Sequence, residues 1–314
     1  MSTEREVVSS QEVAAALAEN IRRVIVGADD ALLTMVMALL VQGHVLIEGP
    51  PGVGKTVLAK SIARSISGTF ARIQCTADML PVDITGANVF NPRDNEFHFR
   101  KGPLFSNVVL VDEINRAPPR TQSAFLECLD ESQVTVDGTT YPIAGPFLAV
   151  ATLNPAHHIG TYPLPETEID RFAAACYLDY LEPPEEFEVV TRQLTKHPVD
   201  GLAPVASVQD ILHAQDAVRS IFVAPEIIRY AVRLVAAARK HPAVQFGPSP
   251  RATMAMVDLA RANAFLSRRD FTTLDDVRAV AVAALVHRVS AGRVGGKSVA
   301  VEVIAEVLGQ VPID

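Results

Sequence analysis

A glycine-rich run ending in lysine and threonine is the part of the sequence best suited to chemistry. The run Gly49-Pro-Pro-Gly-Val-Gly-Lys-Thr56 follows an apolar segment at 44–48 and leads into a helical pattern at 55–67. It matches the phosphate-loop pattern, in which backbone N–H groups and the N-terminus of a helix surround phosphate oxygens. In that arrangement Lys55 would reach the β- and γ-phosphates, and Thr56 would ligate Mg²⁺. The run therefore predicts a binding site for ATP with Mg²⁺.

Two acidic residues follow a second apolar run. Val108–Val111 leads directly into Asp112 and Glu113. A phosphate loop requires an acid at the end of a neighbouring strand, and Asp112 would hold Mg²⁺ there through water. Glu113 could polarise an attacking water as a general base. Because a phosphate-loop kinase must exclude such a water-activating acid, the pair favours hydrolysis of ATP over phosphoryl transfer.

Three further polar residues occupy positions where they could act on a nucleotide. Asn154 ends an apolar run, where it could orient the lytic water or form an Asx-type turn. Arg171 precedes the last predicted strand, and it is either an arginine finger or half of a surface salt bridge with Asp170 or Glu168. Arg251 begins a helix of the C-terminal third, where it could sense the phosphates or lie solvated in the first turn.

The spacing of apolar residues predicts a parallel sheet covered by helices, followed by a helical domain. Residues 44–192 alternate short β-rich runs with helical segments, which is typical of α/β folds, and after residue 204 the strand signals stop. Asp29 or Asp30 is placed to cap the second helix, and the polar stretch 195–204 is interpreted as a linker. The predicted strands are 44–48, 70–74, 108–111, 147–151 and 173–178; the predicted helices are 11–25, 29–41, 55–67, 185–194, 208–221, 225–240, 250–267, 273–289 and 298–308.

Length, composition and charge exclude several classes of protein. The 314 residues can form two domains of ordinary size, and 49% of them are apolar, enough for a core in each. The net charge of −8 is spread along the chain without a basic run, so nucleic acid is not the favoured partner. The N-terminal residues contain no apolar h-region, and the nearest apolar stretch, 31–41, is too short to span a bilayer. We expect a cytoplasmic protein, with Cys75, Cys128 and Cys176 as buried hydrophobic side chains.

Several longer segments of the sequence are highly specific: Thr76-Ala-Asp-Met-Leu-Pro-Val-Asp-Ile-Thr-Gly86, Gly102-Pro-Leu-Phe105, Val111-Asp-Glu-Ile-Asn-Arg-Ala-Pro-Pro-Arg-Thr-Gln122, Gly160-Thr-Tyr-Pro-Leu-Pro-Glu166, Ile169-Asp-Arg-Phe172 and Ser249-Pro-Arg-Ala252. On these segments the chain resembles one family, the MoxR group of AAA+ ATPases, from about Ile25 to the C-terminus. The resemblance implies an α/β fold, with an AAA+ P-loop NTPase core at 1–194, a linker at 195–204 and a small all-α lid domain at 205–314. It also implies an insert in the second helix at about 77–101 and a hairpin ahead of sensor 1 at about 133–145, both facing the pore or the partner.

The resemblance also assigns roles to single residues. Asn154 corresponds to sensor 1, Arg171 to the arginine finger and Arg251 to sensor 2, which with Glu113 make up the predicted catalytic set. ATP would join the core to the lid through Arg251, and hydrolysis would loosen this contact. Because a finger is useful only opposite a neighbour's nucleotide, Arg171 implies an oligomer, and the resemblance implies a hexameric ring. The Val26-Gly27 segment would lie against the adenine. With the phosphate loop, this gives the predicted cofactor-binding residues Val26, Gly27, Gly49, Pro50, Pro51, Gly52, Val53, Gly54, Lys55, Thr56 and Val57. The predicted Mg²⁺ residues are Thr56 and Asp112.

The function implied by the resemblance is a chaperone-like ATPase that remodels or matures a protein complex, often with a partner that carries a von Willebrand factor A domain. Two alternatives stay open: a nucleic-acid motor of helicase or clamp-loader type, and a low-turnover nucleotide-dependent regulator. The insert mixes acidic and basic residues, which favours a protein client over nucleic acid. The sequence departs from the family at Leu153, His157-His158 and Ala173-Ala174, and none of these changes removes a group that touches ATP. The paired histidines have no third ligand nearby, so we expect an exposed loop rather than a metal site.

Overall fold

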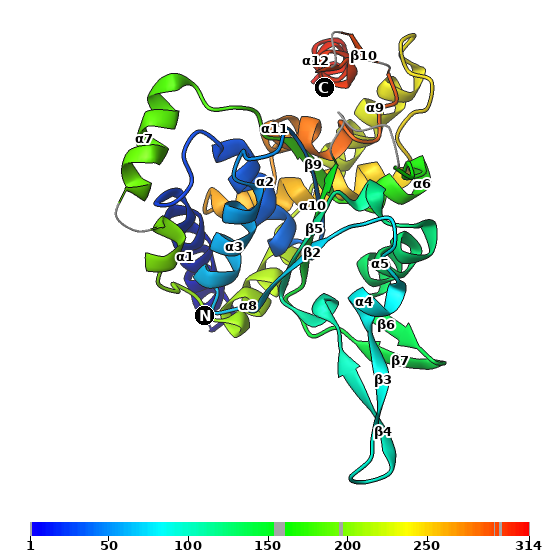
Figure 1. Cartoon of the computed structure of the whole chain (residues 1–314). Helices are drawn as coiled ribbons and strands as arrows, with labels where there is room; N and C mark the ends of the chain where they lie inside the picture. The colour runs from blue at the N-terminus through cyan, green and yellow to red at the C-terminus, as the bar shows by residue number, and fades with distance from the viewer. Residues whose placement is uncertain (1, 154–160, 195–196, 292, 295–296, 314) are drawn as a thin grey trace.

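A five-stranded parallel sheet forms the centre of the computed structural model, which describes residues 2–153, 161–194, 197–291, 293–294 and 297–313 (Figure 1). Every pair of neighbouring strands is parallel, as the alternating pattern predicts. Each strand begins and ends within two residues of its predicted bounds. The strands, in their order across the sheet, are β2 (Phe70–Gln74), β5 (Val108–Asp112), β8 (Leu148–Leu153), β1 (Val45–Glu48) and β9 (Ala174–Tyr177).

The two faces of the sheet pack against different apolar cores, because successive strand residues point to opposite sides. On β5, Val108 and Leu110 join the core that includes helices α1 (Ser2–Arg22), α2 (Asp29–Leu40) and α3 (Lys55–Ser65). Val109 and Val111 join a second core that includes α5 (Pro119–Glu131). Cys75 and Cys128 are buried in this second core and Cys176 is half-buried, which confirms the expectation for two of the cysteines.

The start of the chain differs from the prediction in two details. Helix α1 begins at Ser2 rather than Gln11, and Val7 in the added turns packs partly against the core. The N-cap of α2 is Ala28, which forms no side-chain cap bond, so the predicted capping by Asp29 or Asp30 is wrong. Asp29 occupies the first turn and instead accepts a hydrogen bond from Arg22 Nε at 2.8 Å.

Two β-hairpins project together from one side of the core (Figure 1). The first hairpin, β3 (Gly86–Asn91) and β4 (Glu96–Lys101), follows the short helix α4 (Pro81–Thr85), the part of the predicted insert that is helical. The second hairpin is β6 (Gln133–Val136) and β7 (Thr139–Pro142), within the predicted range 133–145. The Phe99 ring stacks on Tyr141 with centroids 3.8 Å apart, and Asn88 donates to Asp137 at 2.8 Å, so the hairpins form one unit.

The C-terminal part is helical, as predicted, and it packs against the α1 and α2 side of the core. A short strand pair, β10 (Arg293–Val294) and β11 (Lys297–Ser298), precedes the last helix and was not predicted. Among the described residues no helix is both long and apolar enough to cross a bilayer. The helices are α6 (Glu166–Ile169) before β9, then α7 (Pro183–Gln193), α8 (Val208–Arg219), α9 (Pro225–Lys240), α10 (Pro250–Leu266), α11 (Leu274–Leu285) and α12 (Ala300–Gln310).

The described part of the predicted linker, 197–204, is packed onto the core rather than extended in solvent. It contains a 3-10 helix, Pro198–Gly201, in which Val199 is buried. Arg64 Nη1 donates to the Val199 carbonyl at 2.6 Å, and Asn20 Nδ2 donates to the Ala203 carbonyl at 2.9 Å. Two backbone carbonyls of this stretch are therefore hydrogen-bonded to side chains of the core.

Candidate nucleotide site

The glycine-rich loop lies between β1 and α3, where the sequence predicts it. Gly54 is the N-cap of α3 and adopts a left-handed conformation with a φ of 92°. Gly49 has a φ of 154°, and a Cβ there would lie 2.1 Å from the Leu178 carbonyl oxygen. Both positions therefore require glycine.

A cavity of about 400 Å³ opens over this loop. It brings together Lys55, Thr56, Asp112 and Glu113, which the sequence predicts to act on one nucleotide. Beside Gly52 and Gly54 no heavy atom beyond their chain neighbours lies within 4 Å of where a Cβ would be. The lining residues are Pro51, Gly52, Gly54, Lys55, Thr56, Val57, Arg72, Gln74, Asp112, Glu113 and Thr152.

Lys55 is held by the loop itself. Its Nζ donates to the Gly49 carbonyl at 2.6 Å. Burial lowers the pKa of Lys55, and the nearby carboxylates of Asp112, Glu113 and Glu48 partly oppose this effect. A phosphate group in the cavity would offer the ammonium a stronger partner than one carbonyl.

Each of the two acids is bound by an arginine of the same chain. Arg72 Nε lies 2.6 Å from Asp112 Oδ2, and Arg116 Nη1 lies 2.9 Å from Glu113 Oε2. Thr152 on β8 links the acids, because its hydroxyl donates to Asp112 Oδ1 at 3.3 Å and accepts from the Glu113 N–H at 2.9 Å. Glu113 is also left-handed, with a φ of 55°, which is unusual for a residue with a side chain.

Sequence reasoning missed Arg72 and Thr152. Parallel register pairs Gln74 of β2 with Asp112, so Arg72, two residues earlier on the same face of β2, reaches the same end of the sheet. The available signal was an arginine near the end of β2, which becomes informative once β2 is known to pair with β5, the strand that ends in Asp112. Thr152 follows a continuous apolar run, and only the pairing of β8 with β5 shows that it faces Asp112.

The donor set of the cavity fits Mg²⁺ bound together with a phosphate ligand. A carboxylate from Asp112 and a hydroxyl from Thr56 are the oxygen donors that Mg²⁺ prefers, and the ion commonly takes its remaining ligands from phosphate and water. In the described part of the chain, this cavity included, no group of three or more His, Cys, Asp or Glu side chains is placed to hold a metal. His157 and His158 lie outside the described residues.

The two predicted arginines meet at a different place. Arg171 Nη1 lies 2.7 Å from Asp130 Oδ2, and Arg251 Nη1 lies 3.4 Å from Asp130 Oδ1. Asp130 is near the end of α5, and none of the three residues lines the loop cavity. Arg171 thus forms a salt bridge, though not with Asp170 or Glu168 as the alternative supposed. Arg251 reaches Asp130 rather than the phosphate loop of its own chain.

The remaining predicted residues are only partly placed. Asn154 lies outside the described residues, and Leu153 before it is half-buried at the end of β8. Gly27 has a φ of 68°, and a Cβ there would contact Leu181 and Glu185 at the start of α7. Val26, Gly27, Gly49, Pro50 and Val53 do not line the loop cavity.

The phosphate loop, the paired acids, the five-stranded sheet and the helical lid define an AAA+ ATPase. Residues 44–174 match the ATPase family associated with various cellular activities (AAA), and residues 236–306 match the AAA lid domain. The chain is 40% identical over 277 residues to "Chaperone MoxR1" of Mycobacterium tuberculosis, covering 85% of this chain and 73% of that protein. The chain belongs to the MoxR family of AAA+ ATPases.

Two further relatives agree with this assignment. The chain is 44% identical over 270 residues to the uncharacterized protein YeaC of Bacillus subtilis, covering 86% of this chain and 84% of that protein. A crystal structure from Cytophaga hutchinsonii, assigned as an ATPase, superimposes with a TM-score of 0.90 at 33% identity. That match covers 100% of this chain and 98% of the other, so the whole arrangement of core and lid is shared.

Proposed function

We propose that the chain hydrolyses ATP with Mg²⁺ in a hexameric ring and that hydrolysis drives remodelling of a partner protein. The observation that carries this proposal is the separation of two sets of residues. Lys55, Asp112 and Glu113 share one cavity, whereas Arg171 and Arg251 meet outside it on the carboxylate of another helix. A nucleotide in the cavity would therefore receive its arginines from a second subunit, as in a site completed between neighbours.

The residues of the cavity divide the work of hydrolysis. Lys55 and the loop N–H groups would bind the β- and γ-phosphates, and Thr56 and Asp112 would hold Mg²⁺. Bound Mg²⁺ would neutralise charge on the phosphate oxygens. Glu113 takes a proton from the attacking water, and for this its carboxylate must leave Arg116, which lies 2.9 Å away. The contact of Arg116 with Glu113 thus keeps the base occupied until the site is assembled.

Both arginines outside the cavity would act on the neighbour's nucleotide. For Arg251 this replaces the expectation that ATP joins it to the core of its own chain, because Arg251 contacts Asp130 and does not line the loop cavity of that core. Their common partner Asp130 leaves them half-exposed, at 31% for the Arg171 side chain and 48% for that of Arg251. The γ-phosphate of a neighbouring subunit could replace Asp130 as their anionic partner. Assembly of the ring would then exchange an internal ion pair for contacts across the interface.

The projecting hairpins would contact the client. Phe90 and Phe97 are paired across β3 and β4 with centroids 5.3 Å apart, and their exposed fractions are 46% and 70%. Exposed aromatic pairs suit apolar side chains of a polypeptide. The hairpin turn mixes Arg93 with Asp94 and Glu96, which does not favour a phosphate backbone. The relative named as a chaperone in Mycobacterium tuberculosis supports the same class of client.

The test is phosphate release from Mg-ATP across a range of protein concentrations, with and without single- or double-stranded DNA. We expect specific activity to rise with concentration, to be unaffected by DNA, and to fall by about 10³-fold in Arg171→Ala and in Glu113→Gln. Arg229→Gln, which removes an exposed ion pair with Glu226 on α9, is the matched control and should behave as the native chain. Specific activity that does not depend on protein concentration would refute a site formed by residues of two subunits. Strong stimulation by DNA would refute the proposal that the client is a protein.

A further inference from the structure

The backbone around the predicted arginine finger is held by one buried side chain of the lid. Arg288 follows α11, and its side chain is only 2% exposed. Its Nε donates to Asp170 Oδ1 at 2.7 Å. Its Nη2 donates to the carbonyls of Asp170 and Phe172 at 2.9 and 2.8 Å, which are the residues on either side of Arg171. Arg288 therefore hydrogen-bonds to the backbone on both sides of Arg171.

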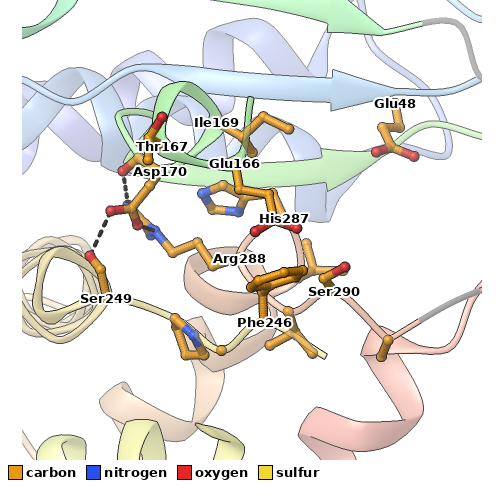
Figure 2. Close-up of a pocket in the computed structure, with 15 residues that line it drawn as sticks. Glu48, Glu166, Thr167, Ile169, Asp170, Phe246, Ser249, His287, Arg288 and Ser290 are labelled. Atoms are coloured by element: carbon orange, nitrogen blue, oxygen red, sulfur yellow. Dashed lines mark hydrogen bonds and ion pairs between the residues drawn. The ribbon is translucent and has the colours of Figure 1, made fainter. Parts of the chain in front are cut away.

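The same carboxylate is also tied to the segment that carries Arg251. Ser249 Oγ donates to Asp170 Oδ2 at 2.6 Å and accepts from the Arg251 N–H at 3.0 Å, as the N-cap of α10. Figure 2 shows Asp170 between Ser249 and Arg288, with dashed lines to both. Asp170, the core residue before Arg171, is thus hydrogen-bonded to Ser249, the lid residue two positions before Arg251.

A cavity borders this junction on one side. Its volume is about 490 Å³, and it is lined among others by Ile169, Phe246 and His287 (Figure 2). His287 adds one hydrogen bond, from Nε2 to the Phe172 carbonyl at 2.9 Å. Buried Phe172 and half-buried Val286 of the lid belong to one apolar cluster, so the bonds of Arg288, Asp170 and Ser249 act together with apolar contact to place the finger relative to the lid.

We propose that Arg288 is a positioning residue that joins Arg171 of the core and Arg251 of the lid into one unit presented to the neighbouring subunit's nucleotide. The inference rests on the proposed function. A buried ion pair contributes little net stability, because desolvation offsets the attraction, so a role in geometry explains this one better than a role in folding. Only the planar guanidinium has donors arranged to reach a carboxylate and several carbonyls at once. A shift of the lid would then move both arginines together.

The inference is tested by mixing inactive subunits. Arg288→Gln keeps its own loop cavity but would misplace its finger, whereas Glu113→Gln keeps its finger but lacks its base. Each alone should release phosphate at least about tenfold more slowly than the native chain. An equimolar mixture should recover a substantial part of the native rate, because some interfaces pair an intact cavity with an intact finger. Binding of a fluorescent ATP analogue by Arg288→Gln should stay within about twofold of the native dissociation constant, since Arg288 is outside the loop cavity.

Two companions separate the possible outcomes. Ser249→Ala removes a single bond to Asp170, so it should show a smaller loss and the same recovery in the mixture, and it covers the case in which Arg288→Gln does not fold. The mixture of Glu113→Gln with Arg171→Ala tests directly whether the arginine finger of one subunit acts on the nucleotide in the cavity of another. If that mixture recovers activity while neither the Arg288 nor the Ser249 variant does, the positioning role is overturned and the proposed function stands. If it does not recover, both the proposed function and this inference are overturned.

Discussion

The buried imidazole of His44 should make the core sensitive to acid. His44 is 3% exposed, and its ring bridges two elements of the core. Nε2 lies 3.1 Å from the Leu129 carbonyl and donates to it, while Nδ1 accepts from the Ala149 N–H at 3.2 Å. Burial lowers the pKa of His44 to about 4, against the weaker opposing effects of the Leu129 carbonyl and Asp130. Protonation would also place a second N–H against that of Ala149, so the folded state strongly prefers the neutral ring.

The size of the effect follows from the two pKa values. The unfolded chain binds a proton at His44 below about pH 6.5, whereas the folded chain does not until about pH 4. The folded state is therefore destabilised as the pH falls through this window. At about 1.4 kcal/mol for each tenfold difference in proton affinity, the loss amounts to about 3 kcal/mol. Below about pH 4 the contribution levels off, because both states are then protonated.

The measurement is the free energy of unfolding by urea at about pH 7 and at about pH 4, for the native chain and for His44→Gln. Glutamine can still donate to the Leu129 carbonyl but does not titrate, so the variant should lose about 3 kcal/mol less than the native chain between the two pH values. The matched control is His213→Gln, at an exposed position of α8. Equal losses in the native chain and in His44→Gln would refute the reasoning.

Three further predictions concern the site and the hairpins. Arg72→Gln should lower the Mg²⁺ concentration for half-maximal activity by roughly fivefold, the equivalent of about 1 kcal/mol, because Arg72 no longer competes for Asp112; a Mg²⁺ titration that shows no change or a higher requirement would count against this. Gly49→Ala should reduce the free energy of unfolding by more than about 1 kcal/mol, because its Cβ would overlap a backbone oxygen at 2.1 Å, whereas Gly201→Ala, with open space around it, should not; equal values would refute the argument. Phe97→Ser should weaken suppression of light scattering by heat-denatured citrate synthase without changing basal phosphate release, and undiminished suppression would exclude the hairpin as the client surface.

The predicted residues of the phosphate loop and the two acids line one cavity, and local sequence pattern explains most of this. A glycine-rich turn between a strand and a helix and two acids after an apolar strand are local signals, and the shared edge of a parallel sheet brings Lys55, Asp112 and Glu113 together. The expectation that the acids follow a strand next to that of the loop is wrong, because β8 lies between β1 and β5. The order of the strands in the sheet decides which other side chains line the cavity. Arg72 and Thr152 enter the site because β2 and β8 flank β5, which no local pattern reveals.

Contacts between distant segments were the least predictable part. Asp130, Arg171 and Arg251 meet although they belong to three separate elements, and an ion pair leaves no periodic signal in a sequence. Helix ends were uncertain for a related reason. Asp29 was a plausible cap by type, but its bond to Arg22 and the position of Ala28 depend on how α1 and α2 pack.

The central claim is that one subunit's arginines act on its neighbour's nucleotide, and a structure of Glu113→Gln assembled with Mg-ATP tests it most directly. Cryo-electron microscopy of that complex should show a ring in which Arg171 and Arg251 have left Asp130 and lie within hydrogen-bond distance of the γ-phosphate in the next subunit. Nucleotide bound with both arginines still on Asp130, or with Arg251 on the nucleotide of its own chain, would contradict the account.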